Sequence, residues 1–127
     1  MRQSKRWILP KGWPIKGLRP PRSAAREAFE EAGVRGKVGA KSIGSFKYDK
    51  ILDEQGIAVQ CEVKVYPLLV KRQSAEWPEV GQRLSQWAEL DKALSLIEES
   101  GIKAIVTAFV ERVGAKRRMT LIKPGPA

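Results

Sequence analysis

Apolar and polar residues alternate most regularly in the middle of the chain, where residues 61–66 read Cys-Glu-Val-Lys-Val-Tyr. A period of two residues is typical of a β-strand with one buried face. The segments 38–48 and 57–70 are therefore predicted as strands. The Asp-Glu-Gln-Gly sequence of residues 53–56, between them, has the composition of a turn.

Shorter elements lie on either side of these strands. Residues 7–9 and 84–88 have the composition of short strands. A helix is predicted to begin at Pro20 and Pro21, since proline is tolerated in the first turn of a helix. Gly33 is a typical helix end, so this helix covers about one dozen residues.

The last third of the chain predicts two further helices, at 91–99 and 102–112. From Gly114 onward the chain is basic and ends in Lys-Pro-Gly-Pro-Ala. We therefore expect a single domain over residues 1–113 and a disordered basic tail over 114–127. This order of strands and helices predicts an α+β fold.

The helix that follows Pro20 carries three glutamates on one face. At about 100° per residue, with Glu27 at 0°, Glu30 lies near 300° and Glu31 near 40°. We expect these carboxylates to face solvent while the opposite arc packs on the core. That arc holds Ala25, Ala28, Phe29 and Ala32. Neighbouring like charges repel each other, and oxygen ligands suit Mg²⁺ or Mn²⁺. Taken alone, the cluster is also compatible with an ordinary solvated helix face.

Composition narrows the range of partners. Lys and Arg total 24 against 14 Asp and Glu in 127 residues, a formal net charge of +10. Such a charge favours nucleic acid, polyphosphate or an acidic membrane surface. No apolar run is long enough for a membrane span, and no signal peptide is evident. The single cysteine, Cys61, suits a reducing compartment, so we expect a cytoplasmic protein. The absence of histidine excludes histidine-based catalytic triads.

Residues 12–34 resemble the Nudix box, whose pattern is G-x5-E-x7-R-E-U-x-E-E-x-G-U, with U an aliphatic residue. The matching residues are Gly12, Arg26, Glu27, Glu30, Glu31, Gly33 and Val34. Leu18 stands where the pattern has a glutamate. The flanking segments 7–14 and 77–83 are similar to a subgroup that includes the diphosphoinositol polyphosphate phosphohydrolases and the diadenosine polyphosphate hydrolases. The resemblance spans about residues 5–113 and implies an α/β/α sandwich with a mixed sheet.

The resemblance also implies a metal-dependent hydrolase of pyrophosphate bonds that uses Mg²⁺ or Mn²⁺. Carried over residue by residue, Glu27, Glu30 and Glu31 are metal ligands, and the carbonyl of Gly12 is a further candidate. Either Glu30 or Glu31 also serves as the general base. Arg26 orients a neighbouring carboxylate, or alternatively pairs with Glu30 on the helix surface.

Basic residues near the glycine-containing loop are candidates for binding an anionic, phosphate-rich small molecule. They are Lys11, Lys16, Arg6, Lys47 and Lys50. Each could instead be a solvated surface charge. Trp13 could stack on a base, although the proline that follows it favours packing. The substrate is expected to be a diphosphoinositol polyphosphate or a dinucleoside polyphosphate, and the sequence does not separate them.

Two other functions stay open. A Nudix-like module that binds nucleic acid, or regulates another protein, with little catalysis would suit the high charge, the basic residues 116–118 and Leu18. The intact glutamate cluster argues against such a module, since a negative patch repels RNA. An RNA 5′-pyrophosphate hydrolase would combine both features.

Few residues precede Trp7, whereas Nudix proteins usually carry one or two strands before this position. We therefore expect a sheet that lacks its first strand or strands and has an exposed edge with unpaired backbone groups. Apolar surface near that edge favours association. The expectation is either a homodimer through this edge or a chain of marginal stability.

Overall fold

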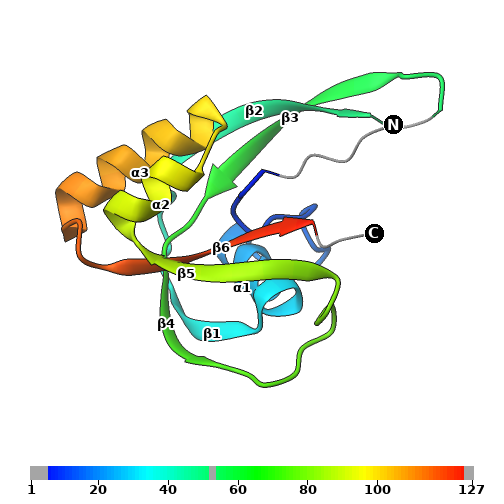
Figure 1. Ribbon diagram of the computed structural model, residues 1–127. Coiled ribbons are helices and arrows are strands. Elements are labelled where there is room, and N and C mark those ends of the chain that lie inside the picture. Colours follow the sequence, from blue (N-terminus) through cyan, green and yellow to red (C-terminus); the bar gives the residue numbers. More distant parts are fainter. Residues whose placement is uncertain (1–5, 52–53, 125–127) are drawn as a thin grey trace.

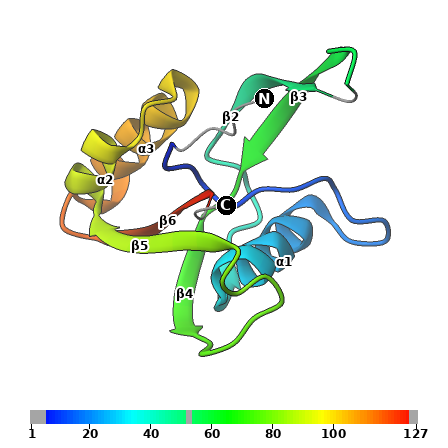
Figure 2. The same cartoon turned by 45° about the vertical axis from the view of Figure 1, so that its right-hand side comes forward.

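The computed structural model describes residues 6–51 and 54–124, which form three helices and six strands (Figure 1). In chain order the elements are α1 (Pro20–Ala32), β1 (Val34–Val38), β2 (Gly44–Ile51), β3 (Ala58–Val65), β4 (Leu68–Gln73), β5 (Arg83–Glu89), α2 (Leu90–Leu96), α3 (Ser100–Val113) and β6 (Arg118–Pro124). Helices α2 and α3 lie on one side of the β5–β6 pair, and α1 lies on the other (Figures 1 and 2). The α+β class predicted from the sequence is confirmed.

The strands pair as three antiparallel ladders, β1 with β4, β2 with β3 and β5 with β6. The hairpin of β2 and β3 extends away from the rest of the molecule (Figure 2). The described residues thus form three two-stranded sheets rather than one continuous mixed sheet. Within residues 6–51 and 54–124, parallel pairing is present as one bridge, between Trp7 and Ile97.

The strand predicted at 7–9 is reduced to isolated bridges. Trp7 pairs with Ile97, and Ile8 exchanges backbone hydrogen bonds with Ile122 (2.7 and 2.9 Å). Pro10 follows at once and has no N–H, so the ladder cannot continue in this direction. The homodimer expected through an exposed sheet edge stays a prediction, which light scattering would test.

The core has two parts, on either side of the β5–β6 pair. The larger part lies under α2 and α3 and includes Phe46, Ile97, Ile105 and Leu121. The smaller part lies under α1 and is formed by Ala32, Val34 and Ile122. Neighbouring residues of β6 therefore supply both parts.

The expectation of a disordered tail is wrong for residues 118–124, which form β6. Leu121 is 0% exposed and Ile122 is 1% exposed. Basic residues dominate the composition of this segment. The strand is nonetheless apolar at Leu121 and Ile122, which point to its opposite faces. The predicted helix at 91–99 is also shorter, because Ile97 leaves the helix to pair with Trp7.

Within the described residues, no helix is long and apolar enough to cross a bilayer. The single cysteine, Cys61, is half-buried on β3, and its thiol donates to the carbonyl of Val59 (3.7 Å).

Candidate functional site

The carboxylates of the candidate site are carried by the second half of α1. Pro20 and Pro21 begin the helix, and Arg19 before them makes no side-chain cap hydrogen bond. The helix ends at Gly33, whose φ of 74° is left-handed and whose N–H donates to the carbonyl of Phe29 (2.8 Å). These two end signals set the length and register of the helix. They thereby place Glu27, Glu30 and Glu31 within its last two turns.

The loop before α1 lies directly against two of these carboxylates. The backbone N–H of Lys11 donates to Oε1 of Glu31 (2.9 Å). Gly12 approaches Glu27 so closely that a Cβ atom at position 12 would overlap the Glu27 carboxyl group. The absence of a side chain at Gly12 therefore allows the loop to reach the helix.

A second loop, residues 74–82 between β4 and β5, lies on the other side of the site. The backbone N–H of Glu79 donates to the carbonyl of Glu30 (3.1 Å). The guanidinium of Arg83 lies between two carboxylates: its Nη2 is 3.4 Å from Oε2 of Glu31, and its Nη1 forms an ion pair with Glu79. On the exposed side of α1, Nε of Arg26 donates to Oε1 of Glu30 (2.9 Å). Four glutamates and two arginines thus form one charged cluster.

Burial and mutual repulsion control the protonation of this cluster. Burial raises the pKa of Glu31 to about 7, and the charges of Glu27 and Glu79 act in the same direction, while the Lys11 N–H and the Arg83 charge oppose them. Burial also raises the pKa of Glu27, followed by the repulsion of neighbouring carboxylates. These carboxylates therefore crowd one another, and a cation between them would relieve that repulsion.

The expectation that all three helix glutamates face solvent is wrong for Glu31, which is only 8% exposed. The glutamates lie on one helix as predicted, but the exposure of each side chain also depends on which segments cover the helix. The segment around Lys11 and the Arg83 side chain both lie against the Glu31 carboxyl group. Glu27 and Glu30 are half-buried.

The cluster has the donor chemistry that Mg²⁺ or Mn²⁺ requires. All its anionic donors are carboxylate oxygens, and the backbone of Gly12 adjoins one of them. In the described part of the chain, no three acidic or thiol groups converge closely enough to hold an ion in their present orientations. Glu30 is turned toward Arg26 and Glu31 toward Arg83, so binding requires these two side chains to rotate.

Two of the five basic candidates lie at a large cavity beside this cluster. The cavity has a volume of about 1350 Å³, and its lining includes Lys11, Gly12, Glu27 and Lys50. Burial lowers the pKa of Lys11, and the Lys50 charge acts in the same direction, while the Glu31 charge opposes them. The other three candidates, Arg6, Lys16 and Lys47, are exposed and are not part of this lining.

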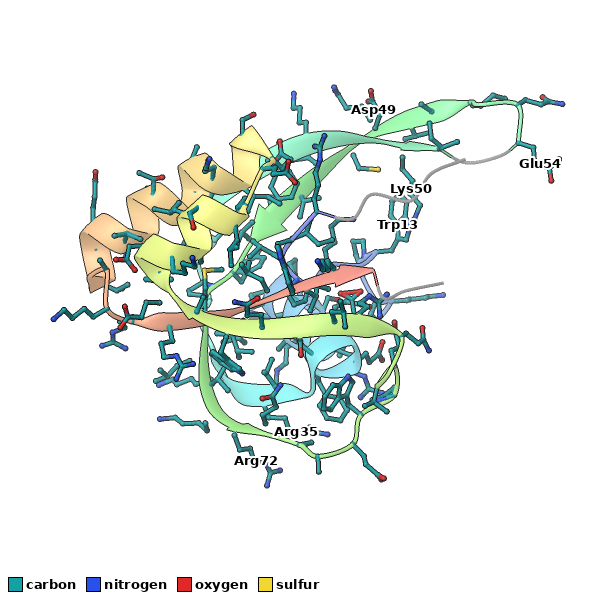
Figure 3. The ribbon with its side chains drawn as sticks, in the orientation of Figure 1. Trp13, Arg35, Asp49, Lys50, Glu54 and Arg72 are labelled. Carbon is teal, nitrogen blue, oxygen red and sulfur yellow. The ribbon has the colours of Figure 1, made fainter. Side chains whose placement is uncertain are left out.

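Trp13 is 51% exposed, so it does not pack inside the protein as the proline after it suggested. The Nζ of Lys50 lies 4.7 Å from the centre of the Trp13 ring, and both residues line the cavity. Figure 3 shows the two side chains next to each other beside the β2–β3 hairpin. A cationic and aromatic pair therefore lies at the cavity, with Trp13 directly after Gly12 and Lys50 on β2.

Comparison with known proteins gives consistent matches over most of the chain. Nudix hydrolase 21, chloroplastic, from Arabidopsis thaliana is 32% identical over 112 residues, which cover 87% of this chain and 54% of the relative. Nudix hydrolase 16, mitochondrial, from the same plant is 34% identical over 105 residues, covering 80% and 58%. Diphosphoinositol polyphosphate phosphohydrolase 3-beta from Bos taurus is 31% identical over 100 residues, covering 76% and 56%. No family model matches the chain.

The chain is a relative of the Nudix hydrolases. It spans about half the length of the curated relatives that it matches. Two of the plant relatives are named as chloroplastic and mitochondrial proteins, so the cytoplasmic location expected here stays a prediction.

Leu18, the departure from the Nudix pattern, lies in the turn of the loop before α1. Its N–H donates to the carbonyl of Ile15 (3.0 Å), and the side chain is 42% exposed. In this position the side chain supports no core, which is compatible with the replacement of a glutamate.

Sequence reasoning missed three residues of the site. Arg83 and Glu79 stand at the end of the Nudix-like flank, and a basic residue four positions after an acidic one was the available signal for their pairing. The third is Ser23, which is 6% exposed and accepts a hydrogen bond from the Ile15 N–H (2.9 Å). A serine within the first turn of a helix was its signal, since such a hydroxyl can bond to nearby backbone.

Proposed function

We propose that this chain is a metal-dependent hydrolase that cleaves a pyrophosphate bond in a phosphate-rich substrate. The observation that carries the proposal is the cluster of four carboxylates around α1, two of which have raised pKa values because they are buried together. Nudix relatives that match most of the chain support the same activity. A structural helix face would not need Glu31 to be buried beside other carboxylates.

The proposed ligands of Mg²⁺ or Mn²⁺ are Glu27, Glu30, Glu31 and the carbonyl of Gly12. When bound, the ion supplies positive charge that stabilises the developing charge on the phosphoryl oxygens. The crowded carboxylates favour such an ion because it removes their mutual repulsion. Gly12 belongs to this set because no side chain separates its backbone from Glu27.

Glu31 is the proposed general base. Burial raises the pKa of Glu31 to about 7 in the metal-free protein, so this carboxylate binds a proton more readily than an ordinary glutamate, as a general base must. In the metal-free protein the Lys11 N–H and Arg83 contact this carboxylate from two sides, and it must turn away from Arg83 to bind an ion. Arg26 has a positioning role, because it contacts Glu30 and lies on the exposed side of the helix.

The substrate is proposed to be a diphosphoinositol polyphosphate or a dinucleoside polyphosphate. Lys11 and Lys50 line the cavity next to Glu27 and provide positive charge for phosphate groups beyond the cleaved bond. One matched relative is named for its action on diphosphoinositol polyphosphate. Arg6, Lys16 and Lys47 stay as candidates for an outer contact with the same substrate.

A hydrolysis assay tests the proposal. The purified chain is incubated with each substrate in chelator and then with Mg²⁺ or Mn²⁺, and released phosphate or nucleotide is measured. We expect turnover only with the ion. Glu31→Gln should lower kcat by about 10²–10⁴, the usual contribution of a general base. Glu98→Gln is the matched control, because Glu98 is exposed and lies between α2 and α3, outside the site.

Calorimetric measurement of Mn²⁺ binding tests the proposed metal ligands separately from the proposed general base. Glu27→Gln should weaken binding, whereas Glu98→Gln should not. Turnover that persists in chelator, or equal turnover in Glu31→Gln and the unaltered chain, would contradict the proposed roles.

A further inference from the structure

The sheet of β1 and β4 exposes four basic side chains. They are Arg35 and Lys37 of β1 and Lys71 and Arg72 of β4, and we call this surface the basic face. The alternate residues of these strands, among them Val34 and Val70, pack on the core part under α1. The basic face is therefore the outer side of a sheet whose inner side is buried.

The strand register places like charges opposite each other. Arg35 and Arg72 are directly paired across the two strands, and Lys37 lies two residues further along the same face. The register shifts between Arg35 and Gly36, so Lys71 is the extra residue of a bulge next to Arg72. Like charges in a direct cross-strand pair repel, and an anion bound across them would remove this cost.

No carboxylate of the described residues serves as such an anion. In the part of the chain that the structure describes, none of the four side chains forms an ion pair with a carboxylate. The guanidinium carbon of Arg35 lies 3.7 Å from the centre of the Phe29 ring. A guanidinium stacked on a ring keeps its N–H groups at the edge, where they can donate to phosphate oxygens.

The basic face lies on the opposite side of α1 from Glu27. Phe29, on which Arg35 packs, is about 200° around the helix from Glu27. Figure 3 shows Arg35 and Arg72 at the β1–β4 end of the molecule, away from Trp13 and Lys50. A polyanion on the basic face would therefore not have to cover the glutamate cluster, which removes the main objection to nucleic-acid binding.

We propose that the basic face binds the sugar–phosphate backbone of nucleic acid, at a site separate from the carboxylate cluster. Arginine suits phosphate because its planar fork of donors can bind two oxygens at once. A lipid surface is the weaker fit. Among the described residues of β1 and β4, Leu69 is the single large apolar side chain that is exposed, and interfacial binding draws on a wider apolar face.

Fluorescence anisotropy of a short, labelled, single-stranded RNA over a series of salt concentrations tests the proposal. The unaltered chain should bind at low salt with an affinity that falls as salt rises. Each phosphate contact contributes about 0.7 to the slope of log affinity against log salt concentration for a single strand. Arg35→Gln with Arg72→Gln should therefore reduce this slope by about 1.4.

Two further variants make the result specific. Lys92→Gln with Lys103→Gln removes the same charge from exposed positions on α2 and α3 and should leave the slope nearly unchanged. Lys37→Gln with Lys71→Gln keeps the Arg35–Phe29 contact, so it reports on the basic face even if the arginine variant folds poorly. It should reduce the slope as the arginine pair does.

The proposal is overturned if RNA does not bind at low salt, or if the α2–α3 variant loses as much affinity as the basic-face variants. Binding to phosphatidylserine vesicles that depends on the basic face, without binding to RNA, would also overturn it. None of these measurements depends on hydrolysis, so their outcome is independent of the activity proposed above.

Discussion

At the scale of single residues, Glu31 is a carboxylate that lies buried among other charged groups. It is buried, it accepts the Lys11 N–H, and it lies beside Arg83, yet burial still raises its pKa to about 7. The balance shows that one backbone hydrogen bond and one guanidinium do not replace the solvation that the carboxylate loses on burial.

This pKa has a consequence for stability in the absence of metal. Below about pH 4.5 the Glu31 carboxyl is protonated in both the folded and the unfolded chain, and between about 4.5 and 7 only the folded chain keeps the proton. The folded state then binds more protons, so the free energy of unfolding falls as pH rises through this window, by at most about 3 kcal/mol.

Urea unfolding at several pH values, in chelator, measures this dependence. Glu31→Gln should flatten it, because glutamine does not titrate, whereas Glu98→Gln should keep it. The same slope in Glu31→Gln and the unaltered chain would show that another group controls the pH dependence.

At the scale of elements, the position of the carboxylates depends on how α1 ends. Gly33 has a φ of 74°, and a Cβ atom at this position would overlap the ring of Trp77. The tryptophan therefore packs on the glycine that stops the helix, next to the point where the Glu79 N–H bonds to the helix at Glu30. The packing of Trp77 on Gly33 and the Glu79–Glu30 hydrogen bond therefore both attach the second loop to the end of the helix.

We expect Gly33→Ala to destabilise the fold by more than the backbone cost of a left-handed alanine. Gly56→Ala is the matched control, because Gly56 has a similar φ of 82° and nothing within 4 Å of the added Cβ atom. The control should lose about 1 kcal/mol, the cost of the backbone alone, and Gly33→Ala about 1–3 kcal/mol more because of overpacking. Equal losses in thermal unfolding would show that Trp77 moves away freely.

The elements that the sequence predicted well are those with local signals. Pro20, Pro21 and Gly33 mark both ends of α1, and alternation marks β3. The burial of Glu31 and its contact with Arg83 depend on loops distant in sequence, so no local pattern contains them. The extent of the short strand at residues 7–9 could not be predicted from its own sequence, because its partners Ile97 and Ile122 decide it.

At the scale of the whole molecule, β6 joins the two parts of the core. Composition favoured a disordered tail, because basic residues surround a strand with few apolar positions. Leu121 and Ile122 are nonetheless buried, one in the core part under α2 and α3 and the other in the part under α1. A strand covered on both faces lacks the alternation that marks a half-buried strand, so periodicity did not detect it.

This arrangement predicts that both parts of the core unfold together. Leu121→Ala and Ile122→Ala should each lower the free energy of unfolding by about 2–5 kcal/mol, and Arg118→Gln, an exposed change on the same strand, by far less. Far-ultraviolet circular dichroism and tryptophan fluorescence should give coincident unfolding curves in every variant, because the damage on one face of β6 removes support from the other. Two separate transitions in Ile122→Ala would mean that the part under α1 unfolds alone, and that β6 does not make the two parts one cooperative unit.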